Sequence, residues 1–134
     1  MTPKIITTLS VFTLLVVLPA FAERPLRANV PFDFKIGETW MTAGEHTVTF
    51  IQPGAVSIRR EDGSGACLAV TMAVQKNVTP DEGKLVFNKY GDSYFLSQIW
   101  SPGYDQGRGF PKTKAEREMA RTIPGEVVAV LARR

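Results

Sequence analysis

The sequence predicts a mainly β fold: a small antiparallel barrel or sandwich of about seven strands, with one short helix near the C-terminus. Two observations support this prediction. Apolar and polar residues alternate with a period of two in several short segments, as in strands with one buried face. Gly and Pro separate these segments at intervals typical of sandwiches and barrels. We expect a signal peptide over residues 1–22 and a single β domain over residues 23–134.

The first half of the chain supplies the clearest alternation. Every second residue of segment 30–36 is apolar, so one face of this strand should lie in a core. That face would carry Val30, Phe32, Phe34 and Ile36. The segments 46–51 and 55–60 follow the same rule on either side of a tight Pro-Gly turn. Their inward residues should be His46, Val48, Phe50, Val56 and Ile58.

Residues 66–74 are almost continuously apolar. Such a run predicts a central strand that is covered on both faces. Cys67, the only cysteine of the chain, lies within it. A lone cysteine in an apolar run is usually a small buried hydrophobe. A reactive thiol or an intermolecular disulfide is the alternative interpretation of Cys67.

Residues 84–100 predict a hairpin around a two-residue turn, Gly91-Asp92, of type II′. Pairing Tyr90 with Ser93 places large apolar groups on both faces, so both should be covered. One face would carry Leu85, Phe87, Tyr94 and Leu96, and the other Val86, Phe95 and Ile99. The segment 101–111 holds three glycines and two prolines and should be irregular.

A capping box predicts where the helix begins. The Thr113 side chain can accept a hydrogen bond from the Glu116 amide, and the Glu116 side chain can reach back to the start of the helix. The helix should run to about Thr122, before a last apolar strand over residues 126–132. Its apolar stripe should hold Ala115, Met119 and Ile123.

The N-terminus has the pattern of a cleaved export signal. Lys4 precedes an apolar run over residues 5–18, and Ala20-Phe21-Ala22 fits the site after which a signal peptidase cuts. The run is shorter than the roughly 20 apolar residues that a membrane-spanning helix needs. We therefore expect a mature chain that starts at Glu23, has no integral membrane segment and is secreted or periplasmic.

The composition offers little for catalysis. The net charge of +3 is too small to indicate a nucleic-acid partner, which usually calls for a strongly basic domain. One histidine and one cysteine, with no accompanying motif, predict no catalytic residues, no metal site and no cofactor. His46 should be a packed or boundary residue of its strand, with a catalytic role as the less favoured alternative.

Aromatic residues are the best candidates for a binding site. Tyr94, Trp100 and Tyr104 flank the exit from the predicted hairpin into a glycine-rich segment. Flat rings on a β scaffold can stack on sugars, line an apolar cavity or contact a protein, so an apolar, glycan or protein ligand is expected there. The alternative is that these rings fill the core of a small domain.

Four segments carry a resemblance to a known group of proteins. Residues 27–34, 43–48, 84–96 and 114–118 are similar to those of uncharacterised exported proteins common in Acidobacteria and related bacteria. The resemblance spans nearly the whole mature chain, but the chain departs from the group at residues 40–42 and at His46. The group has no assigned activity, so the resemblance implies export and fold and supplies no functional residue.

These observations leave three functions open. The first is an exported, non-enzymatic binding or interaction module of the bacterial envelope or exterior. The second is a small extracytoplasmic hydrolase-like enzyme whose carboxylates the fold brings together, at the separation of about 5–10 Å that such sites use. The third is a structural protein of the envelope.

Overall fold

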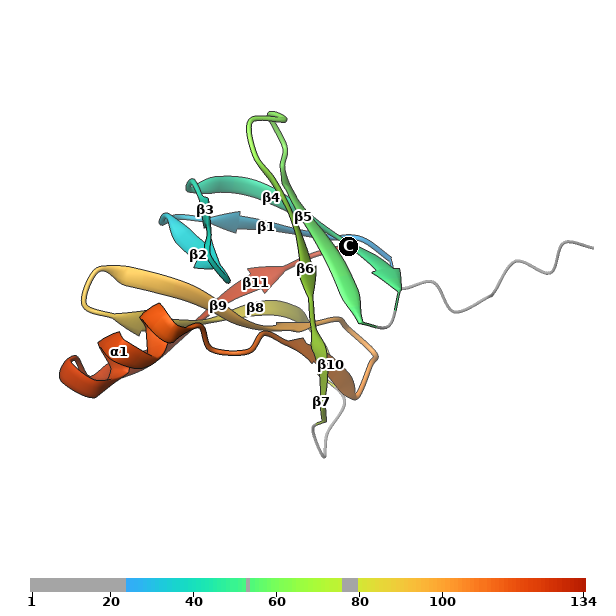
Figure 1. The fold of residues 1–134 in the computed structure, drawn as a ribbon. Coiled ribbons are helices and arrows are strands. Elements are labelled where there is room, and N and C mark those ends of the chain that lie inside the picture. Colours follow the sequence, from blue (N-terminus) through green and yellow to red (C-terminus); the bar gives the residue numbers. More distant parts are fainter. Residues whose placement is uncertain (1–23, 53, 76–79) are drawn as a thin grey trace, which may run out of the picture.

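The computed structural model describes residues 24–52, 54–75 and 80–134 and contains two β-sheets and one short helix (Figure 1). The predicted signal peptide at residues 1–22 lies outside the described residues. The first sheet has the order β1-β4-β5-β6, and the second has the order β11-β8-β9-β10-β7. The short β2–β3 hairpin joins the second sheet where β2 pairs with β9. The elements are β1 (Leu26–Val30), β2 (Phe34–Ile36), β3 (Thr39–Met41), β4 (Gly44–Gln52), β5 (Ala55–Arg60), β6 (Ala66–Val70), β7 (Met72–Gln75), β8 (Gly83–Tyr90), β9 (Ser93–Trp100), β10 (Gln106–Gly109), α1 (Lys114–Thr122) and β11 (Gly125–Ala132).

The mainly β fold class with one short C-terminal helix is confirmed, in the form of two sheets and not a closed barrel. The described residues hold eleven strands against the expected seven, partly because two predicted strands are divided. The chain bends at residues 31–33, which separates β1 from β2. Thr71 separates β6 from β7, which belong to different sheets.

The hydrophobic core lies between the two sheets and confirms the period-two pattern. Both sheets and the short hairpin contribute fully buried side chains, and Phe32 and Phe50 pack half-buried at the margin. Opposed sheets that interdigitate side chains in this way remove apolar surface from water, which is the main stabilising contribution to such a fold. The most buried side chains include Leu26, Val30, Phe34, Val48, Val56, Ile58, Leu85 and Phe87.

The β8–β9 hairpin has the predicted turn but a shifted register. Gly91 has φ of 60°, and no described residue other than glycine has a positive φ, as a type II′ turn requires. The pair Tyr90–Ser93 is also as predicted. A bulge at Ser97 then shifts the pairing, so that Ile99 pairs with Leu85 on the core face. The prediction that Ile99 faces the other side was wrong because of this extra residue.

Strand β10 lies within a segment that was predicted to be irregular. Its glycines are explained by close approach of other side chains and not by a loop. A Cβ on Gly107 would lie 2.8 Å from the indole of Trp100, and a Cβ on Gly109 would lie 2.7 Å from a methyl group of Val74. Both glycines therefore make room for neighbouring side chains in a regular strand.

The apolar run over residues 66–74 is not a central strand. Within the described residues, β6 is an edge of the first sheet and β7 an edge of the second. Leu68, Val70 and Met72 are 71%, 80% and 53% exposed. The prediction of a strand covered on both faces was therefore wrong. A continuous apolar run shows that both faces of a strand are apolar, but it does not show whether other elements cover them.

The helix begins as predicted, with the Thr113 side chain accepting from the Glu116 amide at 3.2 Å. Its predicted apolar stripe is wrong, because Ala115 is exposed and Glu116 is the buried residue of the helix. The Glu116 carboxylate accepts hydrogen bonds from the Tyr90 hydroxyl at 2.9 Å and from the Asn88 side-chain amide at 3.0 Å. These hydrogen bonds attach α1 to the β8–β9 hairpin, near which the helix lies in Figure 1.

Candidate functional site: a slot beside strand β6

The three aromatic residues proposed from the sequence lie apart and in different environments. Tyr94 stacks on Phe32 with a ring separation of 3.7 Å, and Trp100 is fully buried. Tyr94 and Trp100 lie near opposite ends of β9, about 20 Å apart at the usual strand rise. Tyr104 is half-buried in the segment between β9 and β10. The structure thus does not gather the three rings on one surface, and Trp100 offers no exposed face for stacking.

His46 lies in the core, as a packed residue of β4. Its side chain is fully buried and meets the ring of Phe34 edge-on at 5.2 Å. Nδ1 is 2.8 Å from the Gly44 carbonyl oxygen, to which it can donate. Nε2 is buried and has no hydrogen-bond partner among the described residues. Desolvation by burial holds the pKa of His46 below its usual value.

This burial predicts an acid-sensitive stability. The unfolded chain protonates His46 near pH 6.5, whereas the folded chain resists protonation to lower pH. The free energy of unfolding should therefore fall as the pH drops below about 6.5, and His46→Phe should flatten that fall. Because His46 is the only histidine of the chain, urea melts between pH 5 and 7 isolate its contribution. A fall that is unchanged in His46→Phe would contradict this assignment.

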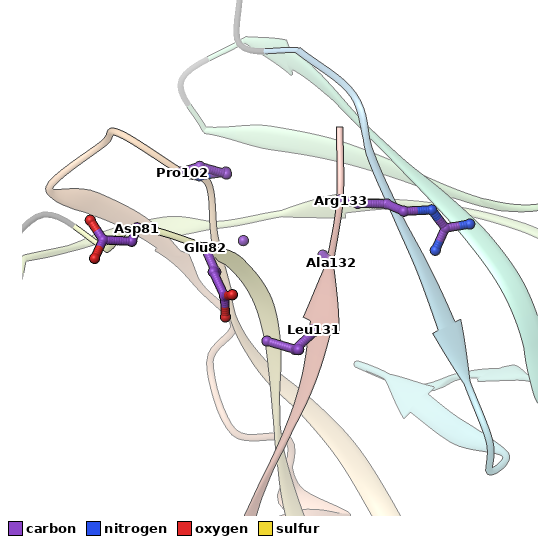
Figure 2. A pocket seen from close by; sticks show the side chains of 7 residues that line it. Asp81, Glu82, Pro102, Leu131, Ala132 and Arg133 are labelled. Carbon is purple, nitrogen blue, oxygen red and sulfur yellow. The ribbon is translucent and has the colours of Figure 1, made fainter.

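A pocket of about 370 Å³ lies between β8, β11 and the end of β9 (Figure 2). Two carboxylates that are adjacent in the sequence, those of Asp81 and Glu82, line it. Asp81 and Glu82 are exposed, and Figure 2 shows their carboxylates pointing in different directions. Arg133 points away from both and forms an ion pair with Glu45 on β4. These groups do not converge on a common point, as general acid and base groups must.

A second cavity of about 360 Å³ runs along the free edge of β6, and we call it the β6 slot. One wall is four consecutive residues of β6, from Cys67 to Val70. The other wall is the chain between β10 and α1, and the β2–β3 turn closes one end. The lining residues are Ile36, Gly37, Glu38, Thr39, Cys67, Leu68, Ala69, Val70, Phe110, Pro111, Lys112 and Thr113.

The slot exists because two paired segments separate. β7 and β10 pair up to Met72 and Gly109. Beyond this pair the chain continues through Pro111, which has no backbone N–H to donate to a neighbouring strand. The two segments diverge from there, and the slot lies between them.

The β6 wall of the slot is apolar, whereas the opposite wall and the β2–β3 turn also contribute polar side chains. The charged lining residues of the slot are one acid, Glu38, and one base, Lys112. Cys67 and Ala69 are half-buried small residues, and Leu68 and Val70 are largely exposed at the rim. Exposed apolar residues grouped beside a cavity are typical of binding sites. Cys67 was predicted to be a small buried hydrophobe; it is half-buried, packs against the core and also lines the slot.

In the part of the chain that the structure describes, no group of three or more His, Cys, Asp and Glu side chains is arranged to hold a metal ion. Among the same residues, no helix has the length and apolarity to cross a membrane. Comparison with known proteins found no matching family model, no matching curated protein and no matching solved structure.

Proposed function

We propose that this chain is an exported, non-enzymatic binding module whose ligand enters the β6 slot. Export is supported by the N-terminal pattern of Lys4, the apolar run and Ala20-Phe21-Ala22, and by the resemblance to exported proteins of Acidobacteria. The mature chain then acts in the periplasm or outside the cell, in an envelope context.

The observation that carries the proposal is the open, apolar edge of β6. Proteins usually protect edge strands with charges, proline or bulges, because an uncovered edge pairs with other chains. β6 has the sequence Ala-Cys-Leu-Ala-Val and contains none of these devices. Leaving Leu68 and Val70 in water costs free energy that a ligand in the slot would recover.

The hydrolase-like alternative receives less support. It needs carboxylates that converge in a cleft, and the side chains of Asp81 and Glu82 diverge (Figure 2). A purely structural envelope role gives no reason for an apolar slot beside an unprotected strand. A binding module accounts for both the slot and the exposed side chains.

Site-specific photocrosslinking tests the proposal. A photoactivatable phenylalanine analogue replaces Leu68 in the exported protein, and the host envelope is irradiated. Position 68 should give a discrete crosslinked adduct. The matched control is position 127, where Val127 is 74% exposed on β11 against 71% for Leu68 on β6. The slot-filling variant Ala69→Phe should abolish the adduct at position 68.

Two results would contradict the proposed binding site. Equal adducts from positions 68 and 127 would show nonspecific contact of exposed apolar residues. An adduct that survives Ala69→Phe, in a protein that melts like the wild type, would place the ligand elsewhere.

A further inference from the structure

The backbone of β6 decides what kind of ligand the slot can take. In an antiparallel pair, alternate residues point their N–H and C=O groups toward the partner strand. On either side of β6, Gly65 accepts from Arg60 at 2.8 Å and Thr71 donates to Gly54 at 2.9 Å. Residues 65 and 71 therefore point toward β5, and so do Cys67 and Ala69 by the same alternation.

The backbone groups of the residues between them point the other way, toward the slot. Ala66, Leu68 and Val70 each direct one N–H and one C=O to the side away from β5. No described strand pairs with β6 on that side. Leu68 and Val70 thus place backbone donors and acceptors at two-residue spacing in one wall of the slot, and Ala66, which precedes the lining residues, continues the row.

Strand β10 shows that the side of the chain facing away from β5 forms backbone hydrogen bonds directly after β6. Phe110 donates to Ser97 of β9 at 2.9 Å, so Gly109 points the opposite way, toward Met72 of β7. Met72 then faces β10 while its neighbour Thr71 faces β5. The chain runs from β6 through Thr71 into β7, and β10 lies on the same side of this stretch as the slot. The slot is the place where this side of the strand loses its partner.

We propose that the ligand is an extended polypeptide segment, which adds to β6 as a strand inside the slot. This inference rests on the proposed function and names its ligand class. A polypeptide backbone supplies donors and acceptors at the spacing of Ala66, Leu68 and Val70. An apolar small molecule or a glycan would leave that row of backbone groups without regular partners.

The slot also defines the side chains of the segment. Successive side chains of an added strand point to opposite faces of the sheet. Those on one face would pack beside Leu68 and Val70, and those on the other would enter the space beside Cys67, Ala69 and Phe110. These neighbouring side chains are apolar, so the segment is apolar at consecutive positions.

A second copy of this chain fits less well than a free segment. Its own β6 is covered by β5 on one side and faces its own 110–113 segment on the other. Two such edges could approach only if both 110–113 segments moved aside. A single extended segment, such as a chain terminus, needs only the space between β6 and the 110–113 segment, which is the slot itself.

The experiment uses the mature chain and a displayed library of random nine-residue peptides. The tightest synthetic peptide is then titrated while amide hydrogen exchange is followed by NMR. In the free protein, the amides of Cys67 and Ala69 should exchange slowly and those of Ala66, Leu68 and Val70 rapidly. The peptide should slow the second group about tenfold or more, as expected for new backbone hydrogen bonds.

N-methylation of the peptide provides an independent readout. Methylating one amide at a time should weaken binding about tenfold or more at every second position and little at the positions between. The variant Leu68→Pro removes an amide that does not pair with β5, so it should weaken binding while leaving the melting curve near that of the wild type.

The outcomes distinguish failure of the strand-addition inference from failure of the proposed function. No enriched peptide, or binding without the alternating pattern, overturns the strand-addition inference. If the position 68 adduct is nevertheless specific, the proposed function stands and the ligand is not a strand. Protection of Ala66, Leu68 and Val70 that depends on protein concentration alone would identify a second copy as the occupant. Loss of both the adduct and peptide binding would overturn both proposals.

Discussion

Replacing Trp100 by alanine should lower the free energy of unfolding by about 3–5 kcal/mol, the usual cost of removing a fully buried large aromatic side chain. Trp100 is 0% exposed and its indole lies over Gly107, where a Cβ would come within 2.8 Å. The indole N–H donates to the Gln98 side-chain oxygen at 2.9 Å. Truncation would leave a cavity between β9 and β10, and urea melts would measure its cost.

Trp40→Ala is the matched control because it makes the same chemical change at a surface site. Trp40 is 63% exposed, with the Lys35 ammonium 4.9 Å from its ring centre. Its loss should cost less than about 1 kcal/mol. Equal costs for the two variants would show that Trp100 is not part of the core, and would restore it as a candidate for ligand stacking.

The alternation of side chains was the most reliable part of the sequence prediction. Val48 and Ile58 were expected to face inward, and they pair across β4 and β5 with both side chains fully buried. A strand has a period of two whatever its neighbours are, so the sequence alone identifies which face is apolar. The turn at Gly91 was predictable for a similarly local reason, since its geometry requires a positive φ.

The position of a strand within a sheet is a property of the whole topology. Residues 66–70 look like a central strand in the sequence, yet β6 is an edge and its apolar groups face the slot. Nothing local distinguishes a strand that a neighbour covers from one that a ligand would cover. The candidate site was missed for this reason, although an apolar strand without charge, proline or bulge is itself a usable signal.

The bulge at Ser97 and the glycines of β10 show a second limit. One extra residue moves every later side chain of a strand to the other face, and no simple residue pattern announces it. The segment that holds Gly107 and Gly109 was predicted to be irregular because it contains three glycines and two prolines. The reason for Gly107 and Gly109 is long-range, since Trp100 and Val74 occupy the space that a side chain would need.

Glu116→Ala is expected to cost about 3 kcal/mol, because it removes a charged acceptor from two hydrogen bonds inside a buried contact. Glu116 is 4% exposed, and its loss would leave the Tyr90 hydroxyl and the Asn88 amide without this partner. Those two contacts attach α1 to the β8–β9 hairpin, so helix amides should exchange faster in the variant. The control is Glu118→Ala, which removes a carboxylate from an exposed position of the same helix and should cost under about 0.5 kcal/mol.

The alkaline limb of the stability curve separates this role of Glu116 from simple helix propensity. Burial, followed by the hydrogen bond to Glu116 and its negative charge, raises the pKa of Tyr90 from 10.0 to about 12. The unfolded chain therefore loses the phenolic proton first, and stability that is complete below pH 10 is lost as the pH rises toward 12. Without Glu116 the folded-state pKa of Tyr90 falls, so the loss of stability between pH 10 and 12 should become shallower in Glu116→Ala. Glu118→Ala should keep the wild-type slope. Equal slopes in the wild type and Glu116→Ala would contradict the coupling between Glu116 and Tyr90.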